Sequence, residues 1–318
     1  MENKKVLFIT FDMSGYYTGV YDELKSRYST VDFYNTATIS YKYKNFFEKV
    51  YSFVYKIFTG RKLKNYYKYQ SLINEVKDNS YDIILIVRPD LFFDAQLTSL
   101  KKATNYFVAY YHDSINNIKR KSEVIHFFDK VYSYEKADVE NYNLEFLPNF
   151  IYFSEISNNY NQTNEVAFSV MSKDYRLNTL KKVAQFFRQN KLDYDFYVMD
   201  KQDINDGLIT FFSKRMNNET VVEHIKKSKI IVDIHKYGIQ DGLTFRAFEA
   251  IGYRKKLITT NKDIKNYDFY NSNNIHVIDD VKNISIPLSF FETNYEEIPT
   301  ELVEKYIVKN WVTTILAQ

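Results

Sequence analysis

Short apolar runs alternate with amphipathic segments along most of the chain, and this alternation most constrains the fold. The run Val6–Phe11 is almost uninterrupted in its hydrophobicity, as is typical of a strand buried on both faces of a parallel sheet. Segments with apolar residues at helical spacing follow such runs. Because strands that alternate with helices form βαβ units, the pattern predicts the α/β class with parallel sheets.

The alternation falls into two series. The first predicts strands at Val6–Phe11, Val31–Tyr34, Asp82–Val87, Tyr106–Tyr111 and Lys130–Ser133. The second predicts strands at Val166–Met171, Asp195–Met199, Ile230–Ile234, Lys256–Thr260 and Ile275–Ile278. The polar, asparagine-rich segment Ser154–Glu165 shows no periodicity and is interpreted as the connection. We therefore predict two Rossmann-like domains facing a central cleft, one at 1–150 and one at 151–300. A helix over 301–318 would return the chain to the first domain.

Composition excludes several classes of protein. The chain has no cysteine, which excludes a disulfide scaffold, thiolate zinc sites and thiol catalysis. No signal peptide and no apolar window long enough to span a membrane are visible, so we expect a cytoplasmic protein. The net charge of +3 is too small to indicate a nucleic-acid partner, and no nucleic-acid-binding module is present.

Glycine is scarce, and its distribution indicates a site. Only 7 of 318 residues are glycine, and three of them lie within His235–Gly252. This segment follows a predicted strand and opens a helix. Free backbone N–H groups and the positive end of a helix dipole make such a junction suited to phosphate binding. Arg246 is placed to add a phosphate contact, and Glu249, one turn further on, to reach a ribose.

Asp241–Glu249 and the residues that follow, Ala250–Asn261, resemble the C-terminal motif of GT-B glycosyltransferases. The segment is similar to the group-1-like enzymes of bacterial capsule and lipopolysaccharide assembly. In that family two acidic residues are separated by seven others, as Asp241 and Glu249 are here. The resemblance implies that Glu249 binds the ribose of a nucleotide-sugar donor and that Asp241 lies near the donor sugar. The first acidic residue is Asp rather than Glu, which leaves the retaining stereochemistry often associated with the motif open.

A second segment, Phe168–Arg176, resembles the first strand and loop of the family's donor domain. The resemblance implies that 1–150 is the acceptor-side domain and 151–300 the nucleotide-sugar donor domain. It also implies that Lys173 and Arg176 face the donor phosphates. His235 is expected to contact the sugar or a phosphate. Gly242, Leu243 and Thr244 are expected to bind the donor at the start of the helix. Structural alternatives remain open: a solvated helix start for Lys173 and Arg176, an ordinary loop histidine at His235, and a structural salt bridge at Glu249.

Three polar residues close predicted strands of the first domain. Asp12 follows the first strand, and His112 and Asp113 follow the strand that ends at Tyr111. Ligands of open α/β sheets bind at the carboxyl ends of strands. A carboxylate or imidazole there is placed to deprotonate an acceptor hydroxyl in an inverting reaction. The alternative is that these residues organise tight turns.

Two acidic patterns suggest metal binding only superficially. Asp193-Tyr194-Asp195 matches the Asp-x-Asp metal motif of the other large glycosyltransferase class, but it precedes a strand instead of ending one. Asp233 and His235 have no evident third ligand. We therefore expect metal-independent transfer without a cofactor, from a nucleotide-sugar substrate of the UDP or GDP type.

Residues 41–68 are strongly basic, with a net charge of +7. The segment contains one acidic residue, Glu48, and eight basic residues: Lys42, Lys44, Lys49, Lys56, Arg61, Lys62, Lys64 and Lys68. Apolar residues recur at helical spacing within Phe46–Phe58. One interpretation is a helix packed on the core with a solvated basic face. The other is peripheral contact with an anionic membrane, which a lipid-linked acceptor would make useful.

These features together predict a glycosyltransferase of the hexosyltransferase type. It would move a sugar from a nucleotide-sugar donor to a surface-polysaccharide or lipid-linked glycan acceptor. Two alternatives stay open: a sugar-nucleotide epimerase on the same fold, and a non-enzymatic membrane-surface or glycan-binding module.

Overall fold

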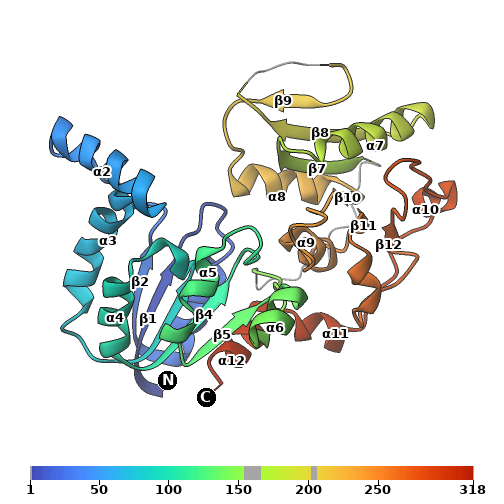
Figure 1. Cartoon of the computed structure of the whole chain (residues 1–318). Helices are drawn as coiled ribbons and strands as arrows, with labels where there is room; N and C mark the ends of the chain where they lie inside the picture. Colours follow the sequence, from blue (N-terminus) through green and yellow to red (C-terminus); the bar gives the residue numbers. More distant parts are fainter. Residues whose placement is uncertain (1, 154–165, 202–205, 318) are drawn as a thin grey trace. The chain divides into compact units, whose positions relative to one another are not determined.

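The computed structural model describes residues 2–153, 166–201 and 206–317 (Figure 1). The chain divides into two compact units. One comprises Met1–Leu147 together with Val312–Gln318, and the other comprises Pro148–Trp311. The predicted connection Ser154–Glu165 lies outside the described residues.

The first unit is built on a six-stranded parallel sheet in the order β2-β1-β3-β4-β5-β6. Its strands are β1 (Glu2–Thr10), β2 (Tyr28–Asn35), β3 (Tyr81–Val87), β4 (Thr104–Tyr111), β5 (Lys130–Ser133) and β6 (Glu145–Phe146). Its helices are α1 (Thr18–Arg27), α2 (Phe46–Thr59), α3 (Leu63–Val76), α4 (Asp94–Lys102), α5 (Arg120–Glu123) and α6 (Lys136–Tyr142). The continuous apolar runs of β1, β3 and β4 are buried, as strands in the middle of a parallel sheet require. The sequence pattern missed β6, which has only two residues.

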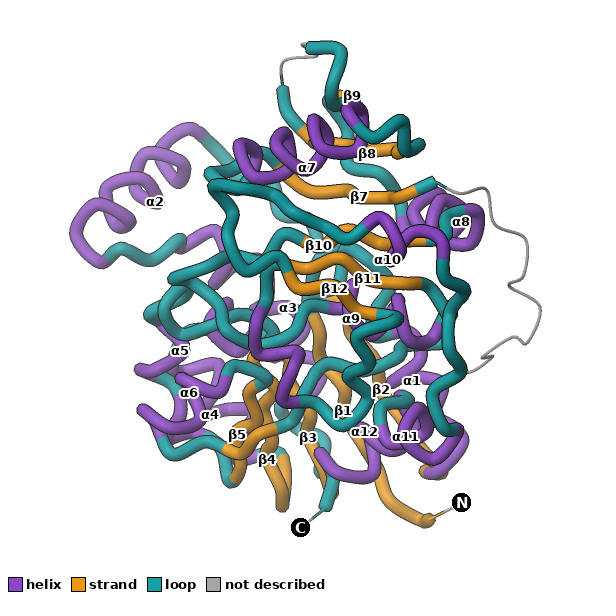
Figure 2. The backbone as a smooth tube through the Cα atoms, turned by 90° about the vertical axis from the view of Figure 1, so that its right-hand side faces the viewer, coloured by secondary structure: helices purple, strands orange, loops and turns teal. Residues whose placement is uncertain are grey.

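The second unit is also a six-stranded parallel sheet, in the order β12-β11-β10-β7-β8-β9 (Figure 2). Its strands are β7 (Ala167–Ser172), β8 (Tyr194–Met199), β9 (Thr210–Phe212), β10 (Ile230–Asp233), β11 (Lys256–Thr259) and β12 (Ile275–Val277). Helices α7 (Leu177–Gln189) and α10 (Leu288–Glu292) pack in one hydrophobic cluster, and α8 (Asn218–Lys227) and α9 (Phe245–Gly252) in another. The strand order reverses between β7 and β10, which is the switch point where such sheets bind ligands.

The C-terminal segment differs from the single helix expected over 301–318. It forms two helices, α11 (Thr300–Lys305) and α12 (Val308–Ile315). The helix is interrupted because the backbone between them pairs with Ile151, whose N–H donates to the Tyr306 carbonyl at 2.8 Å and whose carbonyl accepts from the Val308 N–H at 3.0 Å. Beyond this break the Tyr132 hydroxyl donates to the Thr314 carbonyl at 3.1 Å. The last residues thus belong to the first unit, and the predicted return of the chain is confirmed.

Gly252, one of the clustered glycines, is required for packing. A Cβ atom at this position would lie 2.6 Å from the Phe153 ring and 2.8 Å from a methyl group of Ile151. We expect Gly252→Val to lower the free energy of unfolding by about 1–3 kcal/mol, because the helix cannot approach this segment as closely. Urea denaturation measures the change. Gln189→Val, at the exposed end of α7, introduces the same side chain without a clash and should leave the midpoint nearly unchanged.

Candidate functional site

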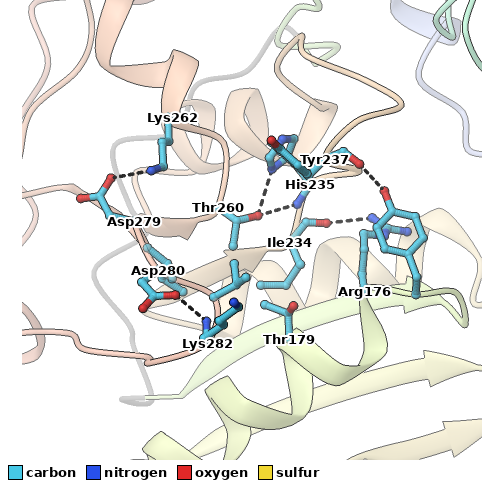
Figure 3. Close-up of a pocket in the computed structure, with 13 residues that line it drawn as sticks. Arg176, Thr179, Ile234, His235, Tyr237, Thr260, Lys262, Asp279, Asp280 and Lys282 are labelled. Atoms are coloured by element: carbon cyan, nitrogen blue, oxygen red, sulfur yellow. Dashed lines mark hydrogen bonds and ion pairs between the residues drawn. The ribbon is translucent and has the colours of Figure 1, made fainter.

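A pocket of about 430 Å³ opens at the carboxyl edge of the second sheet (Figure 3). The loops after β7, β10, β11 and β12 and the start of α7 contribute its walls. Its lining residues are Tyr175, Arg176, Thr179, Ile234, His235, Tyr237, Thr260, Lys262, Ile278, Asp279, Asp280, Val281 and Lys282. The pocket therefore lies where the switch-point rule places the ligand of an open α/β sheet.

Arg176 joins the two loops that flank the switch point. Its guanidinium donates to the Ile234 carbonyl, after β10, at 2.8 Å. It also donates to the Asp174 carboxylate, through Nε at 3.0 Å and through a terminal nitrogen at 2.8 Å. Burial alone would raise the pKa of Asp174, but the hydrogen bonds from Arg176 hold that pKa below its ordinary value. The arginine is consequently held in one orientation at the edge of the pocket.

His235, directly after Ile234, is held at the pocket by Thr260. The Thr260 hydroxyl accepts the His235 backbone N–H at 3.0 Å and lies 3.0 Å from the Nδ1 atom of its ring. Desolvation lowers the pKa of His235, so the imidazole is neutral at pH 7. A neutral ring contacts a sugar hydroxyl or a phosphate oxygen by hydrogen bonding, without a formal charge.

Two tyrosines at the pocket were missed by the sequence interpretation. The Tyr175 hydroxyl donates to the Tyr237 carbonyl at 3.0 Å, and the Tyr237 side chain is 81% exposed. Thr260 was also missed, although it ends a predicted strand at the same sheet edge as His235. The switch-point rule, applied to every strand of the sheet, would have found Thr260. The tyrosines lack such a signal because aromatic residues are abundant throughout this chain.

The start of α9 forms a separate, tightly bonded group. Thr244 is the N-cap: its hydroxyl donates to the Asp233 carboxylate at 2.9 Å and accepts the Arg246 N–H at 3.2 Å. The Asn261 amide donates to the carbonyls of Asp241 and Gly242, each at 3.1 Å. Leu243 buries its side chain in the core of the unit. These contacts make the loop rigid.

Glu249 lies within the protein interior, with its side chain 0% exposed. Its carboxylate accepts the Tyr152 hydroxyl at 2.9 Å and forms an ion pair with Arg246. Burial raises the pKa of Glu249, and Arg246 and Tyr152 oppose that shift. The salt bridge that the sequence left open as an alternative is therefore present, and neither partner is among the residues that line the pocket. The ribose role of Glu249 stays a prediction.

Of the predicted donor-binding residues, only Arg176 and His235 line the pocket. Lys173 follows β7 but pairs with Asp200, after β8, at 2.5 Å. Tyr194 and Asp195 are the first two residues of β8, at the amino edge of the sheet and opposite the pocket, so the Asp-x-Asp pattern does not end a strand. Only Asp193 lies in the αβ connection, in which the sequence interpretation had placed all three residues. Among the described residues, no group of three or more His, Asp or Glu side chains is arranged to hold a metal. Over the same residues, no helix is long and apolar enough to cross a membrane.

The catalytic candidates Asp12, His112 and Asp113 lie at the carboxyl edge of the first sheet. The Asp12 carboxylate accepts three backbone N–H groups, those of Ser14, Gly15 and Tyr17, each at 2.8 Å. Asp12 thus organises a tight turn, which is the alternative that the sequence left open for this residue. The Tyr17 hydroxyl lies 2.8 Å from Nδ1 of His112.

Two cations that the sequence interpretation missed accompany His112 and Asp113. Arg88 adopts a left-handed backbone conformation, with φ of 67°, and binds the Asp90 carboxylate through two nitrogens, each at 2.8 Å. A third nitrogen lies 3.7 Å from Asp113. Lys121 is fully buried, and its ammonium donates to the Asp113 carbonyl. Desolvation lowers the pKa of Lys121 to about 8. This sheet edge is therefore a buried network of opposite charges.

His112 should make the stability of the protein depend on pH. Desolvation lowers its pKa to about 4, whereas the unfolded chain titrates near 6.5. Between these values the unfolded state binds more protons, so the free energy of unfolding should fall as the pH drops from 6.5 to 4. Urea denaturation at pH 7 and 4.5 measures this loss, which His112→Gln should reduce. The exposed His126 provides the control, since His126→Gln should leave the loss as large as in the unmodified chain.

Comparison with known proteins rests on structure alone, because no family model and no curated protein matches the chain. Anabaena Alr3699/HepE, solved in complex with UDP and glucose, is similar over 98% of both chains, with a TM-score of 0.60 and 10% identity. The lipopolysaccharide outer core galactosyltransferase WaaB is similar over 97% of both chains, with a TM-score of 0.51 and 12% identity. The chain has the GT-B fold.

Not every protein similar to this GT-B chain is named a transferase. A putative UDP-N-acetylglucosamine 2-epimerase from Listeria monocytogenes is similar over 99% of this chain and 95% of its own, with a TM-score of 0.51 and 10% identity. At such identities the likeness establishes the fold, and the chemistry has to be argued from the site.

Proposed function

We propose that this protein is a glycosyltransferase that uses a nucleotide-sugar donor. The observation that carries the proposal is the position of Arg176, which joins the loops after β7 and β10 at the edge of the pocket. In a GT-B fold this is the edge of the second sheet at which a nucleotide ligand is expected. An oriented guanidinium matches the geometry of phosphate oxygens and stabilises the charge of a departing diphosphate.

The pocket offers complementary groups for the rest of a nucleotide sugar. Lys262, which lies 3.6 Å from the Asp279 carboxylate, and Lys282 add two further cations to the lining. His235 offers a neutral hydrogen-bonding ring. Tyr175 and Tyr237 present aromatic rings on which a base can stack. Glu249 as the ribose ligand, with Asp241 near the sugar, remains part of the proposal. To bind the ribose, the Glu249 carboxylate would have to replace its contact with Tyr152 or Arg246 by a contact with a ribose hydroxyl.

The proposed reaction is substitution at the anomeric carbon of the donor. The acceptor hydroxyl oxygen forms a bond to this carbon, the bond to the phosphate oxygen breaks, and the nucleoside diphosphate leaves with the electron pair. In an inverting reaction the hydroxyl proton passes to a base of the first unit, for which His112 and Asp113 are better placed than Asp12. The Asp12 carboxylate already accepts three backbone N–H groups. We propose that the transferred sugar is a hexose and that no metal ion takes part in the transfer.

The acceptor we propose is a growing surface polysaccharide or a lipid-linked glycan, handled on the cytoplasmic side of a bacterial membrane. Two observations support this class of acceptor: the motif resemblance at Asp241–Glu249 and the structural similarity to the lipopolysaccharide enzyme WaaB. The first unit would bind the acceptor and the second unit the donor.

Thermal unfolding with UDP, GDP and CMP tests the donor proposal. Binding of one nucleotide to the folded state should raise the melting temperature, by an amount set by its concentration relative to Kd. Hydrolysis of a panel of nucleotide sugars then identifies the sugar. If no nucleotide stabilises the chain, the transferase proposal fails and a non-enzymatic glycan-binding or membrane-surface module becomes the better interpretation.

The similarity to a 2-epimerase supports a second candidate, a sugar-nucleotide epimerase. Both enzymes would bind the same nucleotide, so the products distinguish them. A transferase releases nucleoside diphosphate in proportion to the sugar transferred. An epimerase changes the configuration at one carbon of the sugar and needs no acceptor. NMR of a nucleotide sugar incubated with the protein, with and without a glycan acceptor, separates the two.

A further inference from the structure

Helix α2 presents an unusual surface. It has 14 residues, and only Ser52 among them is buried. Eight of the 15 large hydrophobic side chains that are exposed in the described part of the chain belong to this one helix: Phe46, Phe47, Val50, Tyr51, Phe53, Val54, Ile57 and Phe58. Phe47 and Phe58 are 81% and 84% exposed. The core-packed alternative for this helix is therefore wrong.

The helix is oriented with its apolar face outward. At 100° per residue, the eight exposed apolar side chains fall within an arc of about 160°. Ser52, which is buried, projects from the opposite side of the helix. A surface helix of a globular protein normally turns its apolar stripe toward the core. Here α2 contacts its own unit through its polar face, and Figures 1 and 2 show it extending away from the sheet.

Local contacts define α2 without any burial of its apolar face. The Asn45 side chain accepts the Glu48 N–H at 2.9 Å, and Glu48 accepts the Tyr41 hydroxyl at 2.5 Å and the Lys44 N–H at 2.6 Å. Gly60 ends the helix in a left-handed conformation, with φ of 70°. The helix is thus capped at both ends while its apolar stripe is exposed to solvent.

Exposed cations border the stripe along one edge and at both ends of the helix. Lys49 and Lys56 lie along one edge of it on the helix itself, and four further exposed lysines precede or follow the helix: Lys42, Lys44, Lys62 and Lys64. In the described part of the chain, none of these six forms an ion pair with a carboxylate. An apolar stripe with a basic border is complementary to one kind of surface, the anionic headgroup layer of a lipid bilayer. A second copy of the chain fits poorly, because a two-fold contact would bring the basic borders of both copies together.

We propose that α2 docks this protein on an anionic membrane, with its Phe46–Phe58 stripe in the boundary between headgroups and acyl chains. The six lysines lie against the anionic headgroups. This inference does not depend on the proposed sugar transfer, since the binding surface is distinct from the pocket of the second unit. Docking would bring the first unit to a membrane-bound acceptor and would restrict the search for that acceptor to two dimensions.

Co-sedimentation of the full chain with vesicles tests the proposal without donor or acceptor. The vesicles contain phosphatidylcholine, either alone or with about one-third phosphatidylglycerol. We expect binding to the anionic vesicles that weakens as salt rises, and weak binding to phosphatidylcholine alone. No binding to anionic vesicles at low salt would overturn the proposal. The proposal would also be overturned if the chain did not bind vesicles and instead self-associated in sedimentation velocity, with substitutions in α2 abolishing that self-association.

Two sets of variants separate the apolar and electrostatic contributions. Phe46→Ser/Phe47→Ser/Phe58→Ser should weaken vesicle binding about 100-fold, whereas Tyr142→Ser/Leu288→Ser, at exposed apolar residues elsewhere, should not change it. Replacing Lys42, Lys44, Lys49 and Lys56 by Gln should also weaken it about 100-fold. The matched control replaces the exposed lysines Lys25, Lys77, Lys226 and Lys227 in the same way. If a control set weakens binding as much as its test set, docking through α2 is excluded.

A fluorescent probe distinguishes insertion from adsorption. Phe47→Trp places an indole within the stripe, and anionic vesicles should shift its emission to the blue while the emission of the unmodified chain changes little. An unshifted indole in vesicle-bound protein would contradict insertion of the stripe. Because all substituted side chains are exposed, circular dichroism and the melting temperature should be unchanged, which confirms that each variant is folded.

Discussion

Arg176→Ala should weaken the binding of UDP or GDP, whichever the protein uses, by about 10–100-fold. A charge-assisted hydrogen bond contributes about 1.5–3 kcal/mol, and the pocket would lose an oriented donor to the diphosphate. Turnover should fall as well, because the same guanidinium is proposed to stabilise the departing charge. Isothermal titration with the nucleotide measures the first effect, and release of nucleoside diphosphate from the donor measures the second.

Arg176 also has structural contacts, which the experiment has to separate from ligand binding. It holds the Ile234 carbonyl and the Asp174 carboxylate, so the unliganded variant should melt at a somewhat lower temperature. Arg188→Ala, in the last turn of the same helix and exposed, removes an identical charge and should change neither affinity nor melting temperature. A folded Arg176→Ala protein that binds the nucleotide as tightly as the unmodified chain would exclude the phosphate role.

Glu249→Ala should lower the free energy of unfolding by about 3 kcal/mol. The substitution removes one partner of a buried ion pair, leaves Arg246 without its carboxylate and deprives the Tyr152 hydroxyl of its acceptor. Glu249→Gln keeps an acceptor for Tyr152 and should cost less. Urea denaturation compares both variants with Glu223→Gln on α8, an exposed control that should leave stability unchanged.

The ribose role of Glu249 requires a measurement that a purely structural carboxylate would not affect. If Glu249 contacts the ribose hydroxyls, Glu249→Gln should weaken binding of the nucleotide about 10-fold. The same substitution should have little effect on the 2′,3′-dideoxy nucleotide, which lacks those hydroxyls. Equal losses for the two ligands would show that Glu249 acts through the fold, and the salt bridge with Arg246 would then be its whole function.

Much of the fold was predictable because it is encoded locally. The runs that became β1, β3, β4 and β10 are continuous and apolar, and each is short enough to read as a strand rather than a helix. The C-terminal helix was predicted as one element because its periodicity is unbroken. Its interruption comes from Ile151, more than 150 residues earlier in the chain, and no local pattern contains that information.

The candidate site was predictable only in part. Arg176, which the family resemblance implied, and His235 follow strands that are neighbours in the sheet, and both line the pocket. Tyr175 and Tyr237 were missed because their proximity depends on how two loops meet. Lys121 was missed because a lysine in a short polar segment carries no sign of complete burial.

The sequence by itself determined the α/β class, the two series of strands and the concentration of cations in residues 41–68. These properties depend on the periodicity and composition of contiguous residues, which a single chain displays directly. Only the tertiary structure decided that Glu249 is enclosed by Arg246 and Tyr152, and that the apolar face of α2 points outward. An amphipathic helix has the same sequence whichever way it is turned. Its orientation depends on which face the rest of the chain covers, and here the rest of the chain covers the polar one.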